Sequence, residues 1–294
     1  MATIMKIGGG GGQPNVLTVA VDSGAVVTAT SNGKTVSATS VGGNAVLKLP
    51  KAGTWNVVAT KDGNTAEDVI TISDDYPVEV SFGLPLSSLA EGTLIKLNES
   101  GSGVNFFLGK HDYESGLNGA GRELLVRKDC YTSRVWHDGD YNFYASSSID
   151  NYLNSTYKSV LDAEVQNLIE TTSFYYTVGG GSATVTSLSR SVFMLSVTEW
   201  GLTSSVSNTE GSALPIASAL KNAFLSGGPT ERWTRTAHKT SNSAACCIWS
   251  SGSSLNIGNG SLTSNYGVHP VFTLPATAIV NPEPNADGSY TLIV

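Results

Sequence analysis

The sequence predicts two domains, an all-β sandwich over residues 14–82 followed by an α+β domain over residues 86–294. A length of 294 residues is greater than that of a usual single domain. Short apolar runs separated by turn residues fill the first part, and amphipathic helix patterns appear only in the second. With 40% hydrophobic and 14% charged residues, the chain has the composition of a folded globular protein.

The first domain is predicted to follow a flexible arm. Residues 1–13 contain five consecutive glycines, which favour a disordered tether over a packed element. Apolar runs that begin at Val16 predict short β-strands, and turn signals such as Asn32-Gly33 separate them. Trp55 is expected in the core between two sheets, because a large aromatic side chain in a small sandwich has the most to gain from burial.

The second domain combines helices and strands. Apolar residues at helical spacing predict three helices, at residues 149–154, 161–169 and 216–224. The third helix is expected to end at the Gly-Gly-Pro of residues 227–229. Apolar runs predict strands at residues 192–197, 246–249 and 271–274.

The first domain contains a hairpin motif. The segment from Leu47 to Gly63, with Trp55 at its centre, resembles a hairpin of immunoglobulin-like repeats found in bacterial surface proteins and phage tail proteins. The resemblance implies an immunoglobulin-like sandwich over residues 14–82 that serves as a spacer or connector.

Four motifs follow one another in the second domain: Ser148-Ile-Asp-Asn-Tyr-Leu-Asn154, Val192-Phe-Met-Leu-Ser196, Arg232-Trp-Thr-Arg-Thr236 and Gly267-Val-His-Pro-Val-Phe-Thr-Leu274. In this order they resemble an uncharacterised domain family of gut bacteria and their phages, over about residues 86–280. The last two motifs are also similar to formylglycine-generating-enzyme-like domains of C-type lectin fold. Retroelement-diversified phage variable proteins share that fold. The resemblance implies a C-type-lectin-like, ligand-binding domain over residues 86–294, in which His269 replaces the usual arginine.

Residues 240–266 have an unusual composition, because 12 of these 27 residues are Ser or Asn. Adaptable hydrogen-bonding side chains around rigid aromatic residues are typical of binding loops, and adenine-directed codon diversification would produce the same composition. The alternative is an ordinary turn-rich loop. We expect an exposed cluster on one surface from these candidate ligand-binding residues: Trp233, Arg235, Ser241, Asn242, Trp249, Ser251, Ser253, Asn256, Asn259, Ser264, Asn265 and Tyr266.

No catalytic residue, metal site or cofactor is expected. Cys246 and Cys247 are adjacent and would point to opposite faces of a strand, so they cannot readily share a metal. The four histidines lack zinc-ligand spacing. Whether Asp138 and Asp140 bind calcium stays open. The enzymatic alternative is a formylglycine-generating-enzyme-like oxidase, whose chemistry would rest on the cysteines, or a polysaccharide-degrading tail enzyme. Glycoside cleavage by the latter would need the fold to bring together two carboxylates from the set Glu91, Glu99, Glu123 and Glu199.

The charge and cysteine content limit the partners. A net charge of -7 with scattered basic residues argues against nucleic acid. Three cysteines favour a reducing compartment, and neither a signal peptide nor membrane insertion is expected. The favoured function is a receptor-binding protein of a phage or prophage tail, made in the cytoplasm and carried on the virion. Its ligand would be a cell-surface protein or glycan. A structural virion protein without a ligand is a further alternative, and a homo-oligomer is left open.

Overall fold

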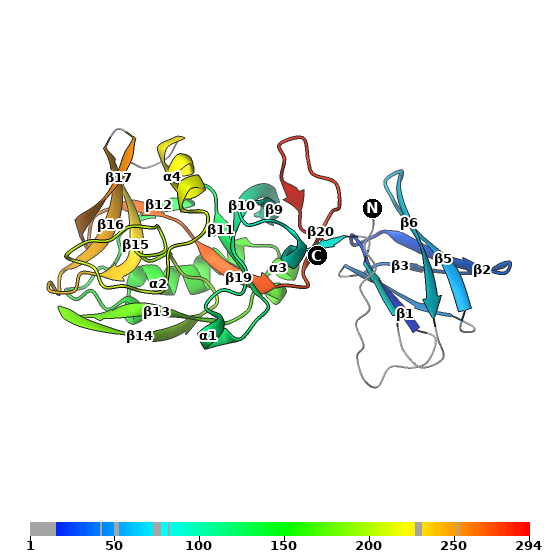
Figure 1. Cartoon of the computed structure of the whole chain (residues 1–294), viewed down its shortest axis with the longest axis horizontal. Helices are drawn as coiled ribbons and strands as arrows, with labels where there is room; N and C mark the ends of the chain where they lie inside the picture. Colours follow the sequence, from blue (N-terminus) through cyan, green and yellow to red (C-terminus); the bar gives the residue numbers. More distant parts are fainter. Residues whose placement is uncertain are drawn as a thin grey trace. The chain divides into compact units, whose positions relative to one another are not determined.

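The computed structural model describes residues 16–41, 43–49, 53–72, 78–81, 83–226, 231–251 and 253–294. Most of their regular structure is β-strand, so the fold is β-rich as expected (Figure 1). The chain divides into two compact units, with the described residues up to Leu89 and Thr277–Val294 in unit 1 and Ala90–Ala276 in unit 2. The predicted arm at residues 1–13 lies outside the described residues, as does the helix end expected at 227–229.

Two sheets make up the larger part of unit 1. One has the order β4-β1-β7 and consists of β1 (Val16–Ala20), β4 (Asn44–Lys48) and β7 (Val78–Ser81). The other has the order β3-β2-β5-β6 and consists of β2 (Val26–Ser31), β3 (Lys34–Thr39), β5 (Gly53–Lys61) and β6 (Asn64–Ile72). β1 runs antiparallel to β4 and parallel to β7.

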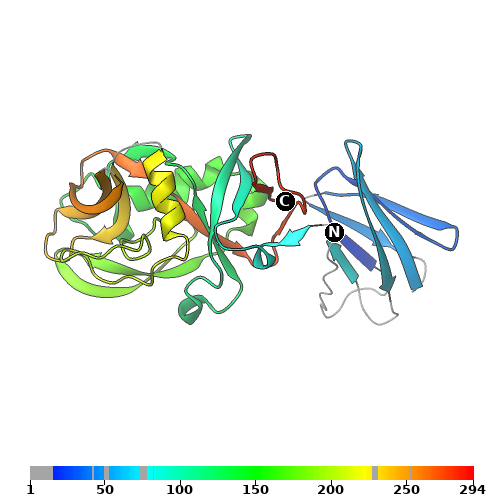
Figure 2. The same cartoon turned by 45° about the horizontal axis from the view of Figure 1, so that its top comes forward.

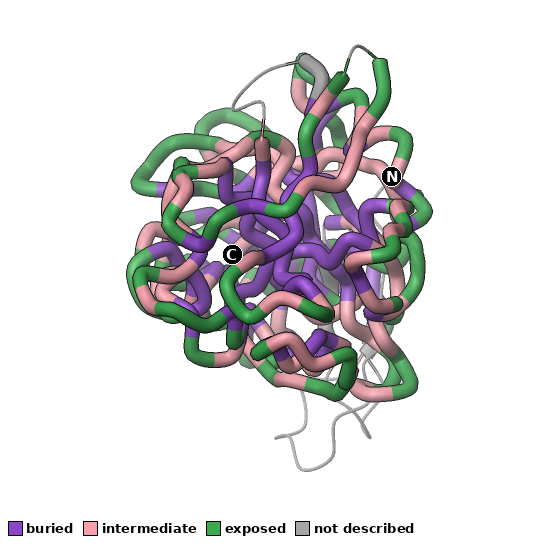
Figure 3. Tube along the Cα trace, turned by 90° about the vertical axis from the view of Figure 1, so that its left-hand side faces the viewer, coloured by how far each residue is buried: buried purple, intermediate pink, exposed green. Residues whose placement is uncertain are grey.

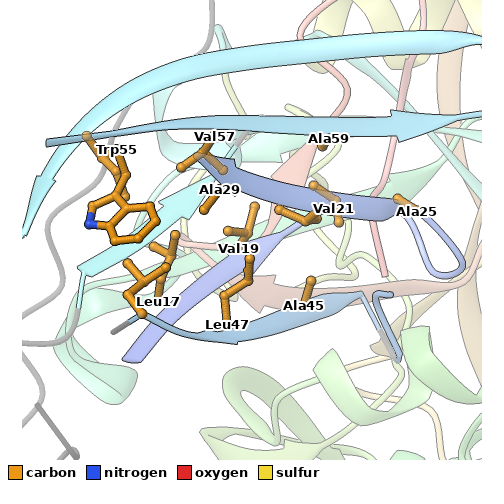
Figure 4. Packing of buried hydrophobic residues seen from close by; sticks show 13 residues of the cluster. Leu17, Val19, Val21, Ala25, Ala29, Ala45, Leu47, Trp55, Val57 and Ala59 are labelled. Carbon is orange, nitrogen blue, oxygen red and sulfur yellow. The ribbon is translucent and has the colours of Figure 1, made fainter. Parts of the chain in front are cut away.

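The core of unit 1 lies between these sheets. Leu17 and Val19 from β1 share one buried apolar cluster with Trp55 and Val57 from β5 (Figure 4). Burial alternates along β4 and β5, because successive side chains of a strand point to opposite faces. The predicted core position of Trp55 is confirmed.

The C-terminal segment belongs to unit 1, whereas the sequence placed it in the second domain. β20 (Ile279–Val280) pairs antiparallel with β8 (Leu84–Pro85), and the backbone N–H of Leu86 donates to the carbonyl of Ala278 at 2.8 Å. The 3-10 turn η1 (Leu86–Ser88) and β21 (Tyr290–Thr291) complete this part. Unit 2 therefore ends at Ala276.

Unit 2 contains two larger sheets and a hairpin. The first sheet has neighbours in the order β19-β11-β10-β9, formed by β9 (Leu94–Glu99), β10 (Ser102–Lys110), β11 (Arg122–Arg127) and β19 (Val271–Pro275). The second has the order β12-β18-β15-β16-β17, formed by β12 (Thr132–Arg134), β15 (Glu231–Ala237), β16 (Ala244–Ser251), β17 (Ser254–Ser261) and β18 (Tyr266–Val268). The hairpin is β13 (Thr172–Gly179) with β14 (Ser182–Arg190).

The position of each strand within the second sheet decides its burial. β15 lies between β18 and β16, whereas β17 has only β16 as a neighbour. Figures 1 and 2 show the β16–β17 hairpin at the periphery of unit 2. In Figure 3 the buried residues follow the inner segments of the trace and the exposed residues follow its outer turns.

The helices of unit 2 are short. They are α1 (Ser115–Asn118), α2 (Ser148–Tyr152), α3 (Ala163–Leu168) and α4 (Ala217–Ser226), with η2 (Tyr144–Ser146), η3 (Leu153–Tyr157) and η4 (Lys158–Val160). Ser147 caps α2, because its side-chain oxygen accepts a hydrogen bond from Asp150 N at 3.1 Å. No helix among the described residues is long and apolar enough to cross a membrane.

The strand predicted at residues 192–197 is wrong. This segment is buried, but only Phe193 forms an isolated bridge, to Val271. Several of its other backbone groups bond side chains: Met194 N donates to Tyr144 OH and Val197 N donates to Thr236 Oγ1. Leu195 O accepts from Arg235 N of β15 at 3.1 Å, but this single bond does not make a ladder. The apolar run therefore predicted correctly that residues 192–197 are buried, but it predicted their backbone conformation incorrectly.

Candidate binding face on the β15–β17 sheet

The structure corrects two of the candidate binding residues. Trp233 is 1% exposed and Arg235 is 0% exposed, so neither belongs to an exposed surface. Both lie on the central strand β15, where Trp233 donates its indole N–H to Arg134 O at 2.8 Å. Both were expected among the exposed side chains of the binding surface, but residues from other segments enclose them, Tyr266 beside Trp233 and Glu199 beside Arg235.

Arg235 is the centre of a buried ion-pair network. Its guanidinium donates to both oxygens of Glu199, at 2.6 and 3.0 Å, and its Nε donates to Tyr175 O at 2.9 Å. A second carboxylate, Glu210, lies 3.8 Å from its Nε. Tyr113 OH also donates to Glu199, at 2.5 Å. One cation therefore lies beside two carboxylates inside the unit.

The pKa values in this network reflect its burial. Burial alone would lower the pKa of Arg235, but Glu199 and Glu210 hold it above its ordinary value. Burial also raises the pKa of Glu210, against the opposing effect of Arg235. Glu199 and Glu210 are two carboxylates in one place, but neither reaches solvent. The network is therefore enclosed within unit 2.

One face of the sheet carries exposed polar and aromatic side chains. Trp249 on β16 is 39% exposed and lies opposite Asn256 on β17 and Glu231 on β15. Partners in register share a face, and so do alternate residues of one strand. We call this surface the Trp249 face and define it by Glu231, Trp249, Ser251, Ser254, Asn256 and Tyr266.

Two glycines let aromatic rings lie against the backbone of β17. A Cβ at Gly258 would lie 3.1 Å from Cδ1 of Trp249, and a Cβ at Gly260 would lie 2.4 Å from Cζ3 of Trp233. The ring of Tyr266 packs beside Trp233 at a centroid distance of 4.6 Å. The glycines thus fix how the rings lie on the sheet. Sequence reasoning missed this role, although glycines at alternate strand positions are a signal of close approach.

The remaining candidates do not share this face. Asn259 is exposed, but its register partner Cys246 places it on the opposite side of the sheet. Ser253 lies in the turn before β17, and Ser264 and Asn265 lie in the segment before β18. The structure therefore brings together Trp249, Ser251, Asn256 and Tyr266, and leaves the others at the edges or behind.

Ser241 and Asn242 lie in a loop that borders an exposed aromatic pair missed by the sequence analysis. Tyr141 is 52% exposed, Phe143 is 39% exposed, and their ring centroids are 5.8 Å apart. The buried Asn142 between them donates to Ser241 O at 3.0 Å, and its backbone N–H donates to Asn242 O at 2.8 Å. The available sequence signal was the order Tyr141-Asn142-Phe143. The middle residue is buried, and its two aromatic neighbours are exposed.

The two adjacent cysteines point to opposite faces, as predicted. Cys246 pairs in register with Asn259, and Cys247 pairs with Gly258 on the Trp249 side. Burial raises the pKa of Cys246 to about 12 and that of Cys247 to about 11. Both side chains are therefore protonated thiols near neutral pH.

The described residues contain no group of three or more His, Cys, Asp or Glu side chains that could hold a metal ion. Asp138 is exposed and its carboxylate accepts a short hydrogen bond from Ser148. That bond holds the pKa of Asp138 below its ordinary value. Asp138 therefore acts as a local partner of the residue that begins α2.

Two of the glutamates considered for catalysis meet at His111. Glu91 accepts from His111 N at 3.0 Å, and Glu123 contacts His111 Nδ1. Burial raises the pKa of Glu123, while His111 opposes the rise. Glu99 instead pairs with Arg127 and Tyr157. Each of these carboxylates is therefore held by a hydrogen bond or an ion pair within the chain.

His269 occupies the position where the family resemblance implied arginine. Its Nε2 accepts from Arg232 Nη1 at 2.6 Å, and its Nδ1 has no hydrogen-bond partner among the described residues. Burial, and then the charge of Arg232, lower the pKa of His269 well below its ordinary value. The neutral imidazole is therefore a core acceptor for a buried arginine.

Unit 2 is thus a β-rich domain with one exposed aromatic face on its five-stranded sheet. The chain matches the model of the family described as Domain of unknown function (DUF6273) over residues 120–276, and it belongs to this family. The match ends where unit 2 ends and spans the four motifs identified in the sequence. No curated protein and no solved structure matches the chain.

Proposed function

We propose that this chain is a ligand-binding protein of a phage or prophage tail, and that it presents the Trp249 face to a cell-surface protein or glycan. The observation that carries the proposal is the partly exposed indole of Trp249, which is set against a strand backbone and surrounded by Ser and Asn side chains. Buried or half-buried aromatic anchors with a polar rim dominate binding surfaces. The sandwich of unit 1 would attach the protein to its particle.

The finer fold assignment is part of this proposal. An immunoglobulin-like sandwich for residues 14–82 is supported by two sheets that enclose Trp55. A C-type-lectin-like fold for the second domain is supported by the position of the Ser- and Asn-rich residues 240–266. They form the β16–β17 hairpin and the start of β18 on a sheet whose central strand β15 is almost entirely buried.

Comparison of the same gene in sibling isolates tests the function without knowledge of the ligand. If the face is selected for binding, substitutions should concentrate at Ser251, Asn256 and the other outward positions, whereas Cys246 and Ile248 should stay fixed. The strand period of two makes this pattern distinct from general loop variability. Variation spread evenly over both faces of β16 and β17, or absent from both, would contradict the proposal.

A further inference from the structure

The outer edge of β17 is open to a further strand. Among the described strands β17 pairs only with β16, and all eight of its residues follow in continuous register without a bulge. Such an edge presents a row of backbone N–H and C=O groups to which another strand can add. Proteins usually protect long edges with charged residues, proline or a bulge. β17 contains none of these protections.

The ladder identifies which backbone groups of β17 point outward. The carbonyl of Cys246 on β16 accepts from Thr234 Oγ1 on β15 at 2.7 Å, so it points away from β17. Asn259 is the register partner of Cys246, and the two residues of such a pair turn their backbone groups away from each other. The N–H and C=O of Asn259 therefore point outward, and alternation along the strand gives the same direction to Ile257 and Leu255. No hydrogen bond from another part of the described chain reaches these three residues.

The side chains of these residues suit close pairing with another strand. Leu255 and Ile257 are apolar but only partly buried, and Asn259 is exposed. All three lie on one side of β17, because alternate residues of a strand share a face. A strand placed beside this edge would cover the remaining apolar surface, and a β-branched residue such as isoleucine packs well against a cross-strand neighbour.

The charge distribution favours a second copy of this chain as that strand. The whole chain has a net charge of -7, but residues 240–266 contain no Asp, Glu, Lys or Arg. Two copies repel where their acidic surfaces approach, whereas a contact through β17 brings two uncharged segments together. The outward residues also complement themselves, because a two-fold axis at Ile257 places Leu255 of one copy opposite Asn259 of the other.

We infer that two copies of the chain pair antiparallel through β17, about a two-fold axis at Ile257. The two isoleucines lie opposite each other, and each outward pair exchanges both backbone hydrogen bonds. The contact is isologous and closed, so it forms a dimer and no fibre. This inference goes beyond the proposed binding function. It places two Trp249 faces on the same side of one continuous sheet, whichever ligand they bind.

The first experiment is sedimentation equilibrium of the full chain, which should show a reversible monomer–dimer equilibrium. Ile257→Pro should raise the dimer dissociation constant by about thirtyfold or more, because two-fold symmetry removes the central N–H donor twice. The folded monomer should accept this proline, since the lost N–H faces solvent at a sheet edge. Ile257→Val is the matched control, and it should leave the dissociation constant within about threefold.

The second experiment tests the register by cross-linking. Residues opposite each other in a hydrogen-bonded antiparallel pair have Cα atoms about 5.5 Å apart, which a disulfide can bridge. Ile257→Cys should therefore give a covalent dimer on mild oxidation. Asn259→Cys is the control, because the two copies of this residue would lie about 13 Å apart along the sheet. It should not cross-link by itself.

Three results would overturn the inference. They are a chain that stays monomeric at all concentrations, a dimer whose affinity Ile257→Pro leaves unchanged, and cross-linking at Asn259→Cys that equals cross-linking at Ile257→Cys. A monomeric chain that binds a foreign extended peptide at β17 would assign the edge to another partner and would also overturn it. If circular dichroism shows that Ile257→Pro is unfolded, the cross-linking pair decides the outcome. Ligand binding by Trp249 is measured separately and can fail without affecting this result.

Discussion

β15 and β17 belong to the same sheet and both carry several polar residues, yet every side chain of β15 except that of Glu231 is buried and most of those of β17 reach solvent. The central strand has a neighbour on each side and covered faces, whereas the outer strand has one neighbour. Arg232 and Arg235 on β15 are fully buried, and Asn256 and Asn259 on β17 are not. A polar composition therefore does not indicate by itself which strand faces a ligand.

The difference extends to hydrogen bonding. On β15, Thr234 Oγ1 donates to Cys246 O at 2.7 Å and Thr236 Oγ1 donates to Glu210 at 2.8 Å. Among the described residues, the side chains of Asn256 and Asn259 have no such partner. Buried polar groups must be paired for the fold to be stable, so the buried polar groups of β15 are committed to structure. Those of β17 remain available for contact with a ligand.

The largest loss of stability is expected when the buried ion-pair network of β15 is broken. Arg235→Met should lower the free energy of unfolding by about 3–5 kcal/mol, because Glu199 and Glu210 would lose their buried cation. Urea denaturation followed by circular dichroism measures the change. Asn259→Ala is the control on β17 and should stay within about 0.5 kcal/mol of the unaltered chain. Equal urea midpoints for the two variants would show that the buried network does not stabilise the fold.

A smaller loss is expected where the Trp233 side chain of β15 reaches across β16 to β17. Gly260→Ala would place a methyl group 2.4 Å from the Trp233 ring, and overpacking of this kind costs about 1–3 kcal/mol. The near-ultraviolet circular dichroism of the aromatic residues should change with it. Gly116→Ala is the matched control, since a Cβ there meets no atom within 4 Å. An unchanged spectrum and stability for Gly260→Ala would contradict the close packing of Trp233 on β17.

Truncation of the exposed Trp249 should cost less stability than truncation of the buried Trp233. Trp249→Ala should lower the free energy of unfolding by about 1–2 kcal/mol, because 39% of the residue is exposed and only the rest packs on the sheet. Trp233→Ala should cost about 3–5 kcal/mol as a core substitution. Parallel denaturation curves of the two variants give the contrast. Comparable losses would mean that Trp249 is a structural residue, which would weaken the case for the binding face.

The smallest effect is predicted for a thiol reagent acting on the two cysteines of β16 in the folded chain. With the pKa of Cys246 raised to about 12, about one side chain in ten thousand is a thiolate at pH 8. The shift raises the pKa, so reactivity should increase only as the pH rises toward that value or as the chain unfolds. A thiol reagent should label Cys246 and Cys247 rapidly in denaturant and hardly at all in the folded chain. Fast labelling of the folded chain would contradict the burial of these cysteines.

Local patterns predicted a substantial part of the fold. Trp55 was placed in the core, and the apolar runs and turn residues of the first domain do correspond to strands. The helical periods around residues 149–154 and 216–224 correspond to α2 and α4, which have somewhat different ends. These predictions depend on neighbours in sequence, for which side-chain period and turn preferences are sufficient physical information.

The candidate site was predicted only in part. Residues 240–266 were identified from composition, and they supply Trp249, Ser251, Asn256 and Tyr266 to one face. Glu231 was not selected, since it lies outside the Ser- and Asn-rich stretch and reaches the face only through strand pairing. The same pairing sends Asn259 to the opposite face. Composition locates a surface, but register decides which of its residues share a side.

The sequence by itself determined the β-rich character of the chain, the core position of Trp55 and the Ser- and Asn-rich segment from which the Trp249 face is built. Only the tertiary structure decided that Arg235 is buried and Trp249 is not. Arg235 is enclosed by Glu199, 36 residues away, and by Tyr175, 60 residues away. Burial on both faces of a central strand is supplied by segments distant in sequence, and no local period of side chains encodes which strand will receive that cover.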